Sequence, residues 1–331
     1  MRKRPRCLLP SFGSSERLNS GKALSHLRLL DRYGRNVTEL RVSVTPKCNL
    51  KCFFCHKEWD PSVEEISKDE LLKTIEVARS FGVRRLKITG GEPLMRQDLP
   101  QIISAASAIV EEVSITTNGT LLSGLSGDLK RAGLARANVN LPTLTPERYA
   151  RICGVGLMDK ALDGISVASS EGIPVKVNMV VLRGVNQDEI ERMIDFTSSF
   201  NGVLQLIELQ PVPADGVTFR AFHLDLASVE ESIRAKAVRS ESARGGQHQR
   251  YFVRHNGGNA VVEIVRPTNN PAFCRKCSKL RVTSDGRLKP CLLRSDNLVD
   301  IAGLVRSGAS SDELAACYKD AIARREPYWK E

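Results

Sequence analysis

The sequence predicts an α/β fold: an incomplete (β/α)6 barrel of parallel strands, followed by a small C-terminal domain. Two observations predict it. Short apolar strand patterns alternate with helical patterns from about residue 40 to residue 209, and this alternation stops near residue 212. Because repeated β–α units build a parallel sheet, the loops that follow the strands should lie at one face. A chain of 331 residues can hold such a barrel and an appendage.

The elements of the barrel can be placed in order. Ser67 and Glu70 form a capping box that opens one helix, and Asp98 caps a second helix with Pro100 in its first turn. Strands are expected at 40–44, 85–89, 113–117, 137–141, 175–182 and 203–209. Further helices are expected over 122–132, from Thr145 and after the capping residue Asn186.

Beyond the barrel the pattern becomes mixed. We expect a polar helix near 225–240, an exposed loop over 240–247, a hairpin of strands 250–254 and 260–265, and a last helix over 311–325. The chain therefore divides into a flexible lead-in at 1–24, a partial barrel at 25–212 and a C-terminal domain at 213–331.

Three cysteines lie on the loop that follows the first strand: Cys48, Cys52 and Cys55. A 4Fe–4S cluster usually takes four thiolates, so this set would leave one iron open for a small molecule. A structural zinc site and chance clustering are the alternatives. Zinc prefers four ligands, and the nearest fourth candidate, His56, adjoins Cys55 with awkward spacing. The set therefore favours an iron–sulfur cluster with an open iron.

A second set of three cysteines lies in the C-terminal domain: Cys274, Cys277 and Cys291. A zinc knuckle completed by His248 or His255 is the alternative here. Two sets of three, rather than two sets of four, favour two clusters that each have an open iron.

Composition limits the class of protein. The hydrophobic content of 41% is ordinary for a globular chain, and no apolar stretch approaches the roughly 20 residues that span a bilayer. The basic N-terminus lacks the apolar segment of a signal peptide, so a cytoplasmic protein with no membrane partner is expected. Single cysteines at 153 and 317 lie in helical stretches and should be buried thiols.

Charge points to an anionic partner. The formal net charge is +11, but the basic residues are scattered and no RNA-binding fingerprint is present, so nucleic acid is not expected. Several basic residues lie on or beside predicted strands: Arg41, Lys87, Lys176, Lys279 and Arg281. Each alone is best explained by a surface salt bridge. Together, charges inside a barrel suggest an anionic ligand.

These motifs, in their order along the chain, resemble the GTP 3′,8-cyclase family of the radical S-adenosylmethionine (SAM) superfamily. The similarity spans about 40–295. It rests on Arg41-Val-Ser-Val-Thr, Cys48-Asn-Leu-Lys-Cys-Phe-Phe-Cys, Thr89-Gly-Gly-Glu-Pro-Leu-Met-Arg, Thr116-Thr-Asn-Gly, Val175-Lys-Val-Asn, Ile207-Glu-Leu and the segment from Cys274 to Leu292. His56 after the third cysteine is similar to the archaeal branch.

The resemblance implies a TIM-like partial barrel and a lyase of molybdenum cofactor (molybdopterin) biosynthesis that uses two 4Fe–4S clusters and SAM. In such enzymes the reduced first cluster donates an electron to SAM, and the resulting 5′-deoxyadenosyl radical abstracts hydrogen from C3′ of GTP. The ribose radical then attacks C8 of guanine, and uptake of one electron from the reductant and one proton completes (8S)-3′,8-cyclo-7,8-dihydroguanosine 5′-triphosphate. The open iron of the second cluster would bind the guanine.

Site residues follow from the resemblance by position. The first cluster would be held by Cys48, Cys52 and Cys55, and the second by Cys274, Cys277 and Cys291. SAM would be contacted by Phe54, Gly91, Asn140 and Gln210. GTP would be contacted by Arg41, Lys87, Thr116, Lys176, Lys279 and Arg281.

The chain departs from the bacterial pattern at several of these positions. Lys87 and Lys279 stand where that pattern has Arg, which keeps the charge but loses the bidentate fork. Asn140 replaces a Ser, Gln210 replaces a Met, and Gln205 stands near an expected Arg.

The C-terminal segment also departs, because it ends Glu326-Pro-Tyr-Trp-Lys-Glu331 without the bacterial Gly-Gly. Only glycine threads backbone into a crowded cavity without side-chain clashes. We therefore expect Tyr328 and Trp329 to anchor this segment outside the barrel, while Asn140 and Gln210 complete the SAM pocket.

The resemblance further implies a reducing electron donor and a downstream cyclic pyranopterin monophosphate synthase, and it is compatible with a homodimer. Two other functions remain open at this point. One is a radical SAM enzyme that modifies a peptide and uses the second cluster as an auxiliary centre. The other is a metal-stabilised nucleic-acid-binding protein, which only the net charge suggests.

Overall fold

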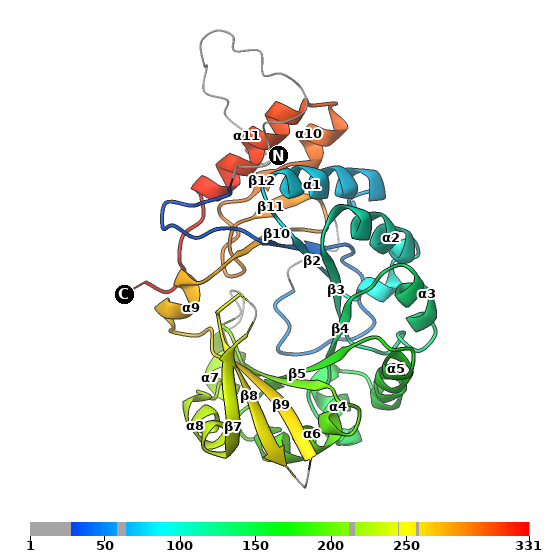
Figure 1. Ribbon diagram of the computed structural model, residues 1–331, viewed down its shortest axis with the longest axis vertical. Coiled ribbons are helices and arrows are strands. Elements are labelled where there is room, and N and C mark those ends of the chain that lie inside the picture. Colours follow the sequence, from blue (N-terminus) through cyan, green and yellow to red (C-terminus); the bar gives the residue numbers. More distant parts are fainter. Residues whose placement is uncertain (1–27, 58–63, 212–215, 244, 256–257, 331) are drawn as a thin grey trace.

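The computed structural model describes residues 28–330 except 58–63, 212–215, 244 and 256–257 (Figure 1). The expected lead-in at 1–24 lies outside the described residues. The strands are β1 Glu39–Ser43, β2 Arg85–Thr89, β3 Glu112–Thr117, β4 Arg136–Asn140, β5 Val175–Val181, β6 Val203–Glu208, β7 Ala237–Ser242, β8 Gln249–His255, β9 Gly258–Val265, β10 Lys279–Val282, β11 Arg287–Lys289 and β12 Val299–Asp300.

The helices alternate with the first six strands and then become irregularly spaced. They are α1 Lys68–Ser80, α2 Leu99–Ile109, α3 Ser126–Arg131, α4 Pro146–Cys153, α5 Met158–Ser170, α6 Ile190–Ser198, α7 Gly216–Phe222, α8 Ala227–Lys236, α9 Pro271–Arg275, α10 Ala302–Arg306 and α11 Ser311–Ala323, with short 3-10 turns η1 Pro93–Met95 and η2 Gln187–Glu189.

Within the described residues the strands form one sheet, in the order β12-β11-β10-β1-β2-β3-β4-β5-β6-β9-β8-β7. Neighbours from β1 to β6 are parallel, as the β–α repeat predicts. The C-terminal part extends the sheet beyond both β1 and β6. Strand β10 continues the sheet parallel to β1, and β9 continues it parallel to β6.

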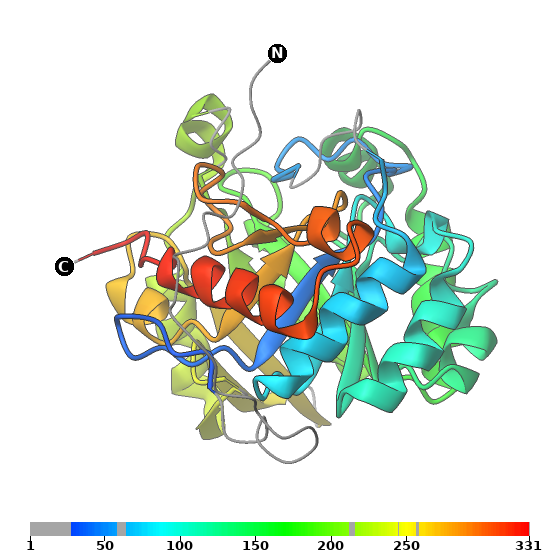
Figure 2. The ribbon, with the colours of Figure 1, turned by 90° about the horizontal axis from the view of Figure 1, so that it is seen from above.

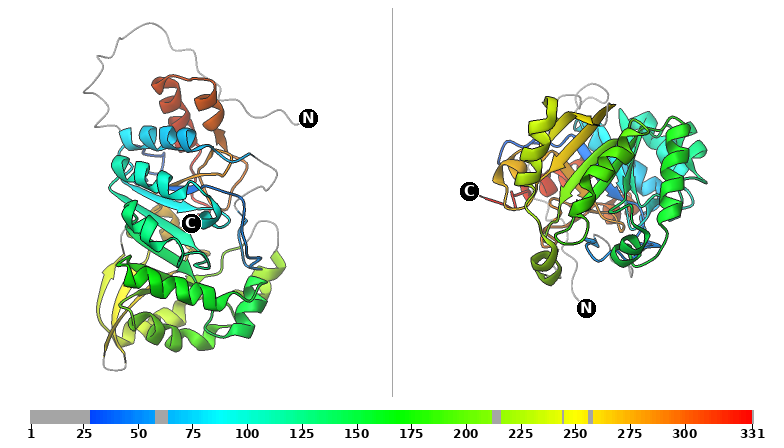
Figure 3. Two further views of the ribbon diagram at one scale, coloured as in Figure 1. Left: turned by 90° about the vertical axis from the view of Figure 1, so that its right-hand side faces the viewer. Right: turned by 90° about the horizontal axis from the view of Figure 1, so that it is seen from below.

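Helices cover the outer face of the sheet, with α1, α2, α3 and α5 following one another along it (Figures 1 and 2). Helix α11 packs on α1, where the hydroxyl of Tyr318 donates to the carbonyl of Thr74 at 2.8 Å. The hairpin of β8 and β9 lies at the end of the molecule opposite α10 and α11 (Figure 3).

The two faces of each barrel strand differ in chemistry. In β1, Leu40 and Val42 are buried in the apolar core, whereas Glu39, Arg41 and Ser43 line a central cavity. Side chains alternate between faces along a strand, so one face packs the helices while the other remains available to a ligand.

Helix starts agree with the sequence in part. The capping box of Ser67 and Glu70 is present. Asp98 occupies the N-cap position of α2, but its side chain accepts hydrogen bonds from Arg96 and caps nothing. Asn186 likewise does not cap: its amide donates to the carbonyls of Pro142 and Val180. The side chains of Asp98 and Asn186 therefore form hydrogen bonds with these other groups instead of with the N–H groups of the helices.

Three expectations about element bounds were wrong. The helix expected over 122–132 begins only at Ser126, after a turn. The polar helix expected to 240 ends at Lys236, and the chain continues as β7, which includes part of the expected loop. Pairing with β8 supplies backbone hydrogen bonds that override the local polarity of this stretch.

Two further expectations can be compared with the structure. Cys153 and Cys317 are buried, which confirms the prediction for both thiols. Among the helices of the described residues, none combines the length and apolar character needed to cross a membrane.

Candidate active site

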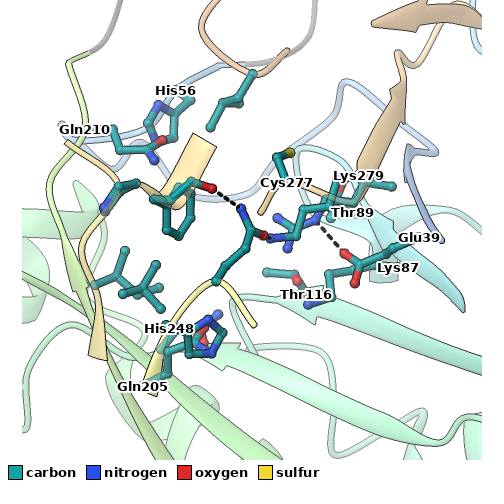
Figure 4. Close-up of a pocket in the computed structure, with 18 of the residues that line it drawn as sticks. Glu39, His56, Lys87, Thr89, Thr116, Gln205, Gln210, His248, Cys277 and Lys279 are labelled. Atoms are coloured by element: carbon teal, nitrogen blue, oxygen red, sulfur yellow. Dashed lines mark hydrogen bonds and ion pairs between the residues drawn. The ribbon is translucent and has the colours of Figure 1, made fainter. Parts of the chain in front are cut away.

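A cavity of about 950 Å³ opens on the inner face of the sheet (Figure 4). This volume is at the upper end of the range for pockets that hold small ligands. Every basic strand position singled out in the sequence lines it: Arg41, Lys87, Lys176, Lys279 and Arg281. These cations therefore share one interior, and the anionic ligand expected there stays a prediction.

Strand register explains why these cations lie together. Arg41 of β1 is the direct partner of Lys87 of β2 on one side and of Arg281 of β10 on the other. Partners at equal height on neighbouring strands point to the same side of a sheet. The three cations therefore form a row across the cavity wall, and Thr116 lies on the wall near Lys87 (Figure 4).

The electrostatics of this row favour an anion. Burial, together with the nearby charge of Arg41, holds the pKa of Lys87 well below its ordinary value. For Glu39, burial opposes ionisation, but the charges of Arg41, Lys87 and Lys279 outweigh it and hold the carboxyl pKa below its ordinary value. One carboxylate faces several cations at this position, so an anionic ligand would relieve repulsion.

A second cluster of charged side chains lies on the opposite wall of the cavity, between β5, β8 and β9. The carboxylate of Glu263, which is fully buried, accepts hydrogen bonds from Lys176 Nζ, from Arg250 Nη2 at 2.7 Å and from Gln205 Nε2 at 2.7 Å. His248 Nε2 lies 3.1 Å from the same carboxylate. Sequence reasoning missed Glu263. A single carboxylate within the apolar strand expected at 260–265, which pairs with the strand that carries Arg250, was the available signal.

Two of the backbone contacts that hold the loop of the first cysteine set come from the Gly91–Glu92 turn. Gly91 N donates to the carbonyl of Thr45 at 2.8 Å, and Glu92 N donates to the carbonyl of Lys47 at 2.7 Å. A Cβ atom at Gly91 would lie 2.2 Å from the Lys47 carbonyl oxygen, so only glycine permits this approach.

Glu92 connects this turn to the end of β3. Its carboxylate accepts from the Thr117 hydroxyl at 2.6 Å and from the backbone N–H groups of Asn118 at 2.7 Å and Leu94 at 3.0 Å. Burial raises the pKa of Glu92 to about 7 despite these bonds. Asn118 in turn donates to Asn49, inside the cysteine loop, at 2.8 Å. Sequence reasoning missed Asn49, and its place between two cysteines was the available signal.

The members of the first cysteine set differ in position. Cys55 and Phe54 line the cavity, whereas Cys48, Cys52 and Gly91 are not among the lining residues. Cys48 Sγ accepts from Leu50 N at 3.5 Å. A hydrogen bond with Cys153 and burial raise the pKa of Cys52.

The second cysteine set lies on the same cavity. Cys274, Cys277 and Cys291 all line it, together with Phe273. Helix α9, which carries Cys274, is capped by Asn270, whose side chain accepts from Phe273 N at 3.0 Å. The fold therefore brings residues 55 and 277, which are far apart in the sequence, to a single cavity.

The C-terminal segment contradicts our expectation. Tyr328 and Trp329 line the cavity and do not anchor the segment on the outside of the barrel. Burial raises the pKa of the Cys274 thiol, and hydrogen bonds from the backbone N–H groups of Trp329 and Tyr328 oppose that rise. The rings of Tyr328 and Trp329 contact each other edge to face, with centroids 4.9 Å apart.

Asn140 and Gln210, expected to complete the SAM pocket, both line the cavity. The Asn178 amide donates to Asn140 at 3.3 Å, and Gln210 lies beside His56 (Figure 4). The histidines considered as zinc ligands are engaged elsewhere, since His255 contacts Asp195 at 2.7 Å and His248 contacts Glu263.

Comparison with known proteins now decides the family. Residues 42–197 match the Radical SAM superfamily and residues 203–331 match Molybdenum Cofactor Synthesis C. A Probable GTP 3′,8-cyclase of Thermococcus kodakarensis is 42% identical over 306 residues, which cover 91% of this chain and 100% of that protein. One of Archaeoglobus fulgidus is 43% identical over 309 residues, which cover 91% of this chain and 99% of that protein.

The chain belongs to the GTP 3′,8-cyclase family.

Solved structures support the fold of this GTP 3′,8-cyclase family member. Streptococcus suis SuiB bound to S-adenosylmethionine superposes with a TM-score of 0.63 at 19% identity, over 86% of this chain and 68% of that chain. The enzyme titled anSMEcpe with bound AdoMet gives a TM-score of 0.57 at 15% identity, over 80% of this chain and 78% of that chain. The predicted partial barrel of the radical SAM type is confirmed.

Membership of the GTP 3′,8-cyclase family implies 4Fe–4S clusters and SAM as cofactors, and the donor chemistry fits them. Each set offers three thiols, and backbone N–H groups reach Cys48 and Cys274. Within the described ranges, no three His, Cys, Asp or Glu side chains converge on one metal ion. Each thiolate of a cubane binds a different iron.

Proposed function

We propose that this protein is a GTP 3′,8-cyclase, which converts GTP into (8S)-3′,8-cyclo-7,8-dihydroguanosine 5′-triphosphate in molybdenum cofactor biosynthesis. The observation that carries the proposal is that one cavity is lined by cysteines of both sets and by a row of strand cations. Similarity over 91% of the chain to proteins named Probable GTP 3′,8-cyclase supports the same reaction.

Each cysteine set has its own task in this proposal. Cys48, Cys52 and Cys55 hold the first cluster, and Cys274, Cys277 and Cys291 hold the second. When bound, the first cluster and SAM supply the radical chemistry that removes hydrogen from C3′ of GTP. The protein's part is to hold C3′ and C8 of the substrate so that the new bond forms before water or another group intervenes.

SAM is assigned to the mouth of the cavity, where the first loop meets the ends of the strands. Phe54, Asn140 and Gln210 line this part, and amides there can both donate and accept hydrogen bonds. Gly91, which does not line the cavity, acts in this proposal by letting the Gly90–Glu92 backbone approach Lys47. That approach fixes the cysteine loop over the end of β2.

GTP is assigned to the interior. Its triphosphate carries several negative charges, which match the cations of the wall, and charge-assisted hydrogen bonds to phosphate are among the stronger polar contacts. The residues assigned to GTP are Arg41, Lys87, Thr116, Lys176, Lys279 and Arg281. In this proposal the guanine lies beyond Lys279, next to the second cysteine set.

The proposal extends to partners and place. A reducing electron donor is required, because the first cluster must be reduced before each turnover. The cyclised nucleotide would pass to a downstream cyclic pyranopterin monophosphate synthase. A reducing compartment such as the cytoplasm suits eight described cysteines that are all free thiols.

The function is tested by anaerobic incubation of the reconstituted protein with SAM, GTP and a reductant, followed by chromatography and mass spectrometry. We expect 5′-deoxyadenosine and a cyclised isomer of GTP in matching amounts. ATP in place of GTP serves as the specificity control. Cleavage of SAM that is indifferent to GTP would reject the proposal.

A further inference from the structure

A tight turn at residues 31–35 precedes β1. Asp31 Oδ1 accepts hydrogen bonds from the backbone N–H groups of Tyr33 and Arg35, both at 3.0 Å. Gly34 closes the turn at φ +72°, a conformation that glycine adopts without cost. Asp31 therefore fixes the position at which the Arg35 side chain leaves the backbone.

Two guanidinium groups meet at the other oxygen of this aspartate. Asp31 Oδ2 accepts from Arg35 Nε at 2.7 Å and from Arg325 Nη1 at 3.0 Å. The three side chains are 0%, 5% and 1% exposed for Asp31, Arg35 and Arg325. Two cations and one anion in a buried site leave a net positive charge that solvent screens poorly.

Both guanidinium groups reach the second cysteine set. Arg35 Nη1 donates to the carbonyl oxygen of Cys274 at 3.1 Å, and Arg325 Nη2 donates to that of Cys277 at 2.8 Å. The residues come from three distant parts of the chain: the turn before β1, the α9 region over 274–277 and the segment that follows α11. We call Asp31, Arg35 and Arg325 the arginine clamp.

Two buried nitrogens of the clamp, Arg35 Nη2 and Arg325 Nε, have no hydrogen-bond partner in the described part of the chain, and of these two residues Arg35 alone lines the cavity. Arg35 does so together with Cys274, Cys277 and Cys291. A buried donor without an acceptor destabilises the fold, so this N–H group of Arg35 requires an acceptor that binds in the cavity.

We propose that Arg35 donates a hydrogen bond through Nη2 to the 4Fe–4S cluster of the second cysteine set, and that the arginine clamp raises the reduction potential of that cluster. The inference rests on the second cluster of the proposed function, and it is independent of the substrate. Reduction adds negative charge to a cluster, so a nearby cation and a hydrogen bond to a sulfur both favour the reduced state. Arg35 and Arg325 are thus positioning residues that also tune the cluster.

The test is a redox titration of the full-length reconstituted protein, followed by electron paramagnetic resonance. The signal of the second cluster is identified by its loss in Cys291→Ser. For Arg35→Gln we expect the ratio of reduced to oxidised second cluster at a fixed potential to fall about tenfold, which is a shift of 59 mV for one electron. Arg35→Lys, which keeps the charge, should shift less.

The matched control is Arg32→Gln. Arg32 belongs to the same turn, but it is 58% exposed and pairs with Glu326. The Arg32→Gln substitution should leave the reduction potential of the second cluster unchanged. A wild-type potential in Arg35→Gln with full iron content would overturn the proposal. If Arg35→Gln lost iron, Arg35→Lys would decide: iron retained with a near wild-type potential supports the electrostatic role, and iron lost in both variants reduces Arg35 to a folding role and overturns it.

The outcome is separable from that of the proposed function, because the titration contains no GTP. A lowered potential in Arg35→Gln, combined with a wild-type protein that forms no cyclised nucleotide, would uphold the clamp and reject the function. An unchanged potential in Arg35→Gln, combined with normal cyclisation of GTP by the wild type, would reject the clamp and uphold the function.

Discussion

Glu263 and Lys176 form a buried ion pair across the wall of the cavity, joining β9 to β5. Glu263 is also shared by Arg250, so one carboxylate neutralises two cations. This pairing keeps Lys176 in place while it lines the cavity, and it means that a bound triphosphate would share Lys176 with Glu263.

The first prediction concerns the pH dependence of stability. Burial opposes ionisation of Glu263, but the His248 hydrogen bond and the charge of Lys176 hold its pKa below the ordinary value of 4.5. A carboxyl whose pKa is depressed on folding stabilises the fold above its unfolded pKa, and this stability is lost as the pH falls. The free energy of unfolding should therefore decline below pH 4.5, and Glu263→Gln should flatten that decline.

Chemical denaturation across pH measures this effect. Glu76→Gln is the control, because Glu76 is 53% exposed and pairs only with Lys73 in the contacts described. At pH 7, Glu263→Ala should cost about 3–5 kcal/mol, since it leaves Lys176 buried without its counter-ion and removes one of the partners of Arg250. Equal acid sensitivity in Glu263→Gln and the wild type would contradict the account.

The second prediction concerns the two cysteine sets. Cys48→Ser should lower the iron and sulfide content by about half and abolish SAM cleavage, whereas Cys291→Ser should lower iron equally but leave uncoupled 5′-deoxyadenosine formation. Cys317→Ser, at a buried thiol outside both sets, should keep full iron. Full iron in both of the first two variants would remove the assignment of two clusters.

The third prediction concerns the cation row. Arg281→Ala should weaken GTP binding by about 1.5–3 kcal/mol and SAM binding much less, because hydrogen bonds to a charged group are worth that amount. Arg287→Ala is the matched control on β11, since Arg287 pairs with Asp285 at 2.6 Å and is not among the lining residues. Calorimetry with each ligand decides. Equal losses for both ligands would indicate damage to the fold.

The fourth prediction concerns proton uptake. The pKa of Lys87 is depressed by burial and by Arg41, and a bound triphosphate would favour its charged form. GTP binding should therefore take up protons at pH values where the free protein holds Lys87 partly neutral, and the affinity should fall as the pH rises through that range. Titration calorimetry in buffers of different ionisation enthalpy measures the uptake. Lys87→Arg, which stays charged, should bind GTP without it; identical uptake in that variant would assign the proton elsewhere.

The fifth prediction concerns the C-terminal segment. Because backbone N–H groups of Tyr328 and Trp329 reach Cys274, truncation after Glu326 should make the second cluster more labile to chelators. The first cluster should persist. Trp329→Phe, which keeps the backbone, is the control. If the truncated protein released iron at the wild-type rate, the segment would have no part in holding the cluster.

Local patterns allowed much of the fold to be predicted. The capping box at Ser67 and the strand Arg85–Thr89 depend on neighbouring residues, and both are where the sequence placed them. The sequence pattern predicted a helix and a loop where β7 lies. This strand could not be predicted from its own residues, because its stability comes from pairing with β8.

The site divides in the same way. Cysteine spacing and alternation identified Cys277 and Lys87, which line one cavity. The bond between Asn49 and Asn118, and that between Asp31 and Arg325, join residues distant in sequence and carry no short motif. The bulk of Trp329 suggested a position outside the barrel, but the contact with Cys274 is made by the backbone N–H group of Trp329, which the side chain does not indicate.

The most direct test of the central claim uses GTP deuterated at C3′. After anaerobic turnover with SAM and reductant, mass spectrometry of the 5′-deoxyadenosine reports where its new hydrogen came from. We predict one deuterium per molecule, together with a cyclised nucleotide that has lost it. Unlabelled 5′-deoxyadenosine beside recovered, fully deuterated GTP would contradict the proposal that this cavity cyclises GTP.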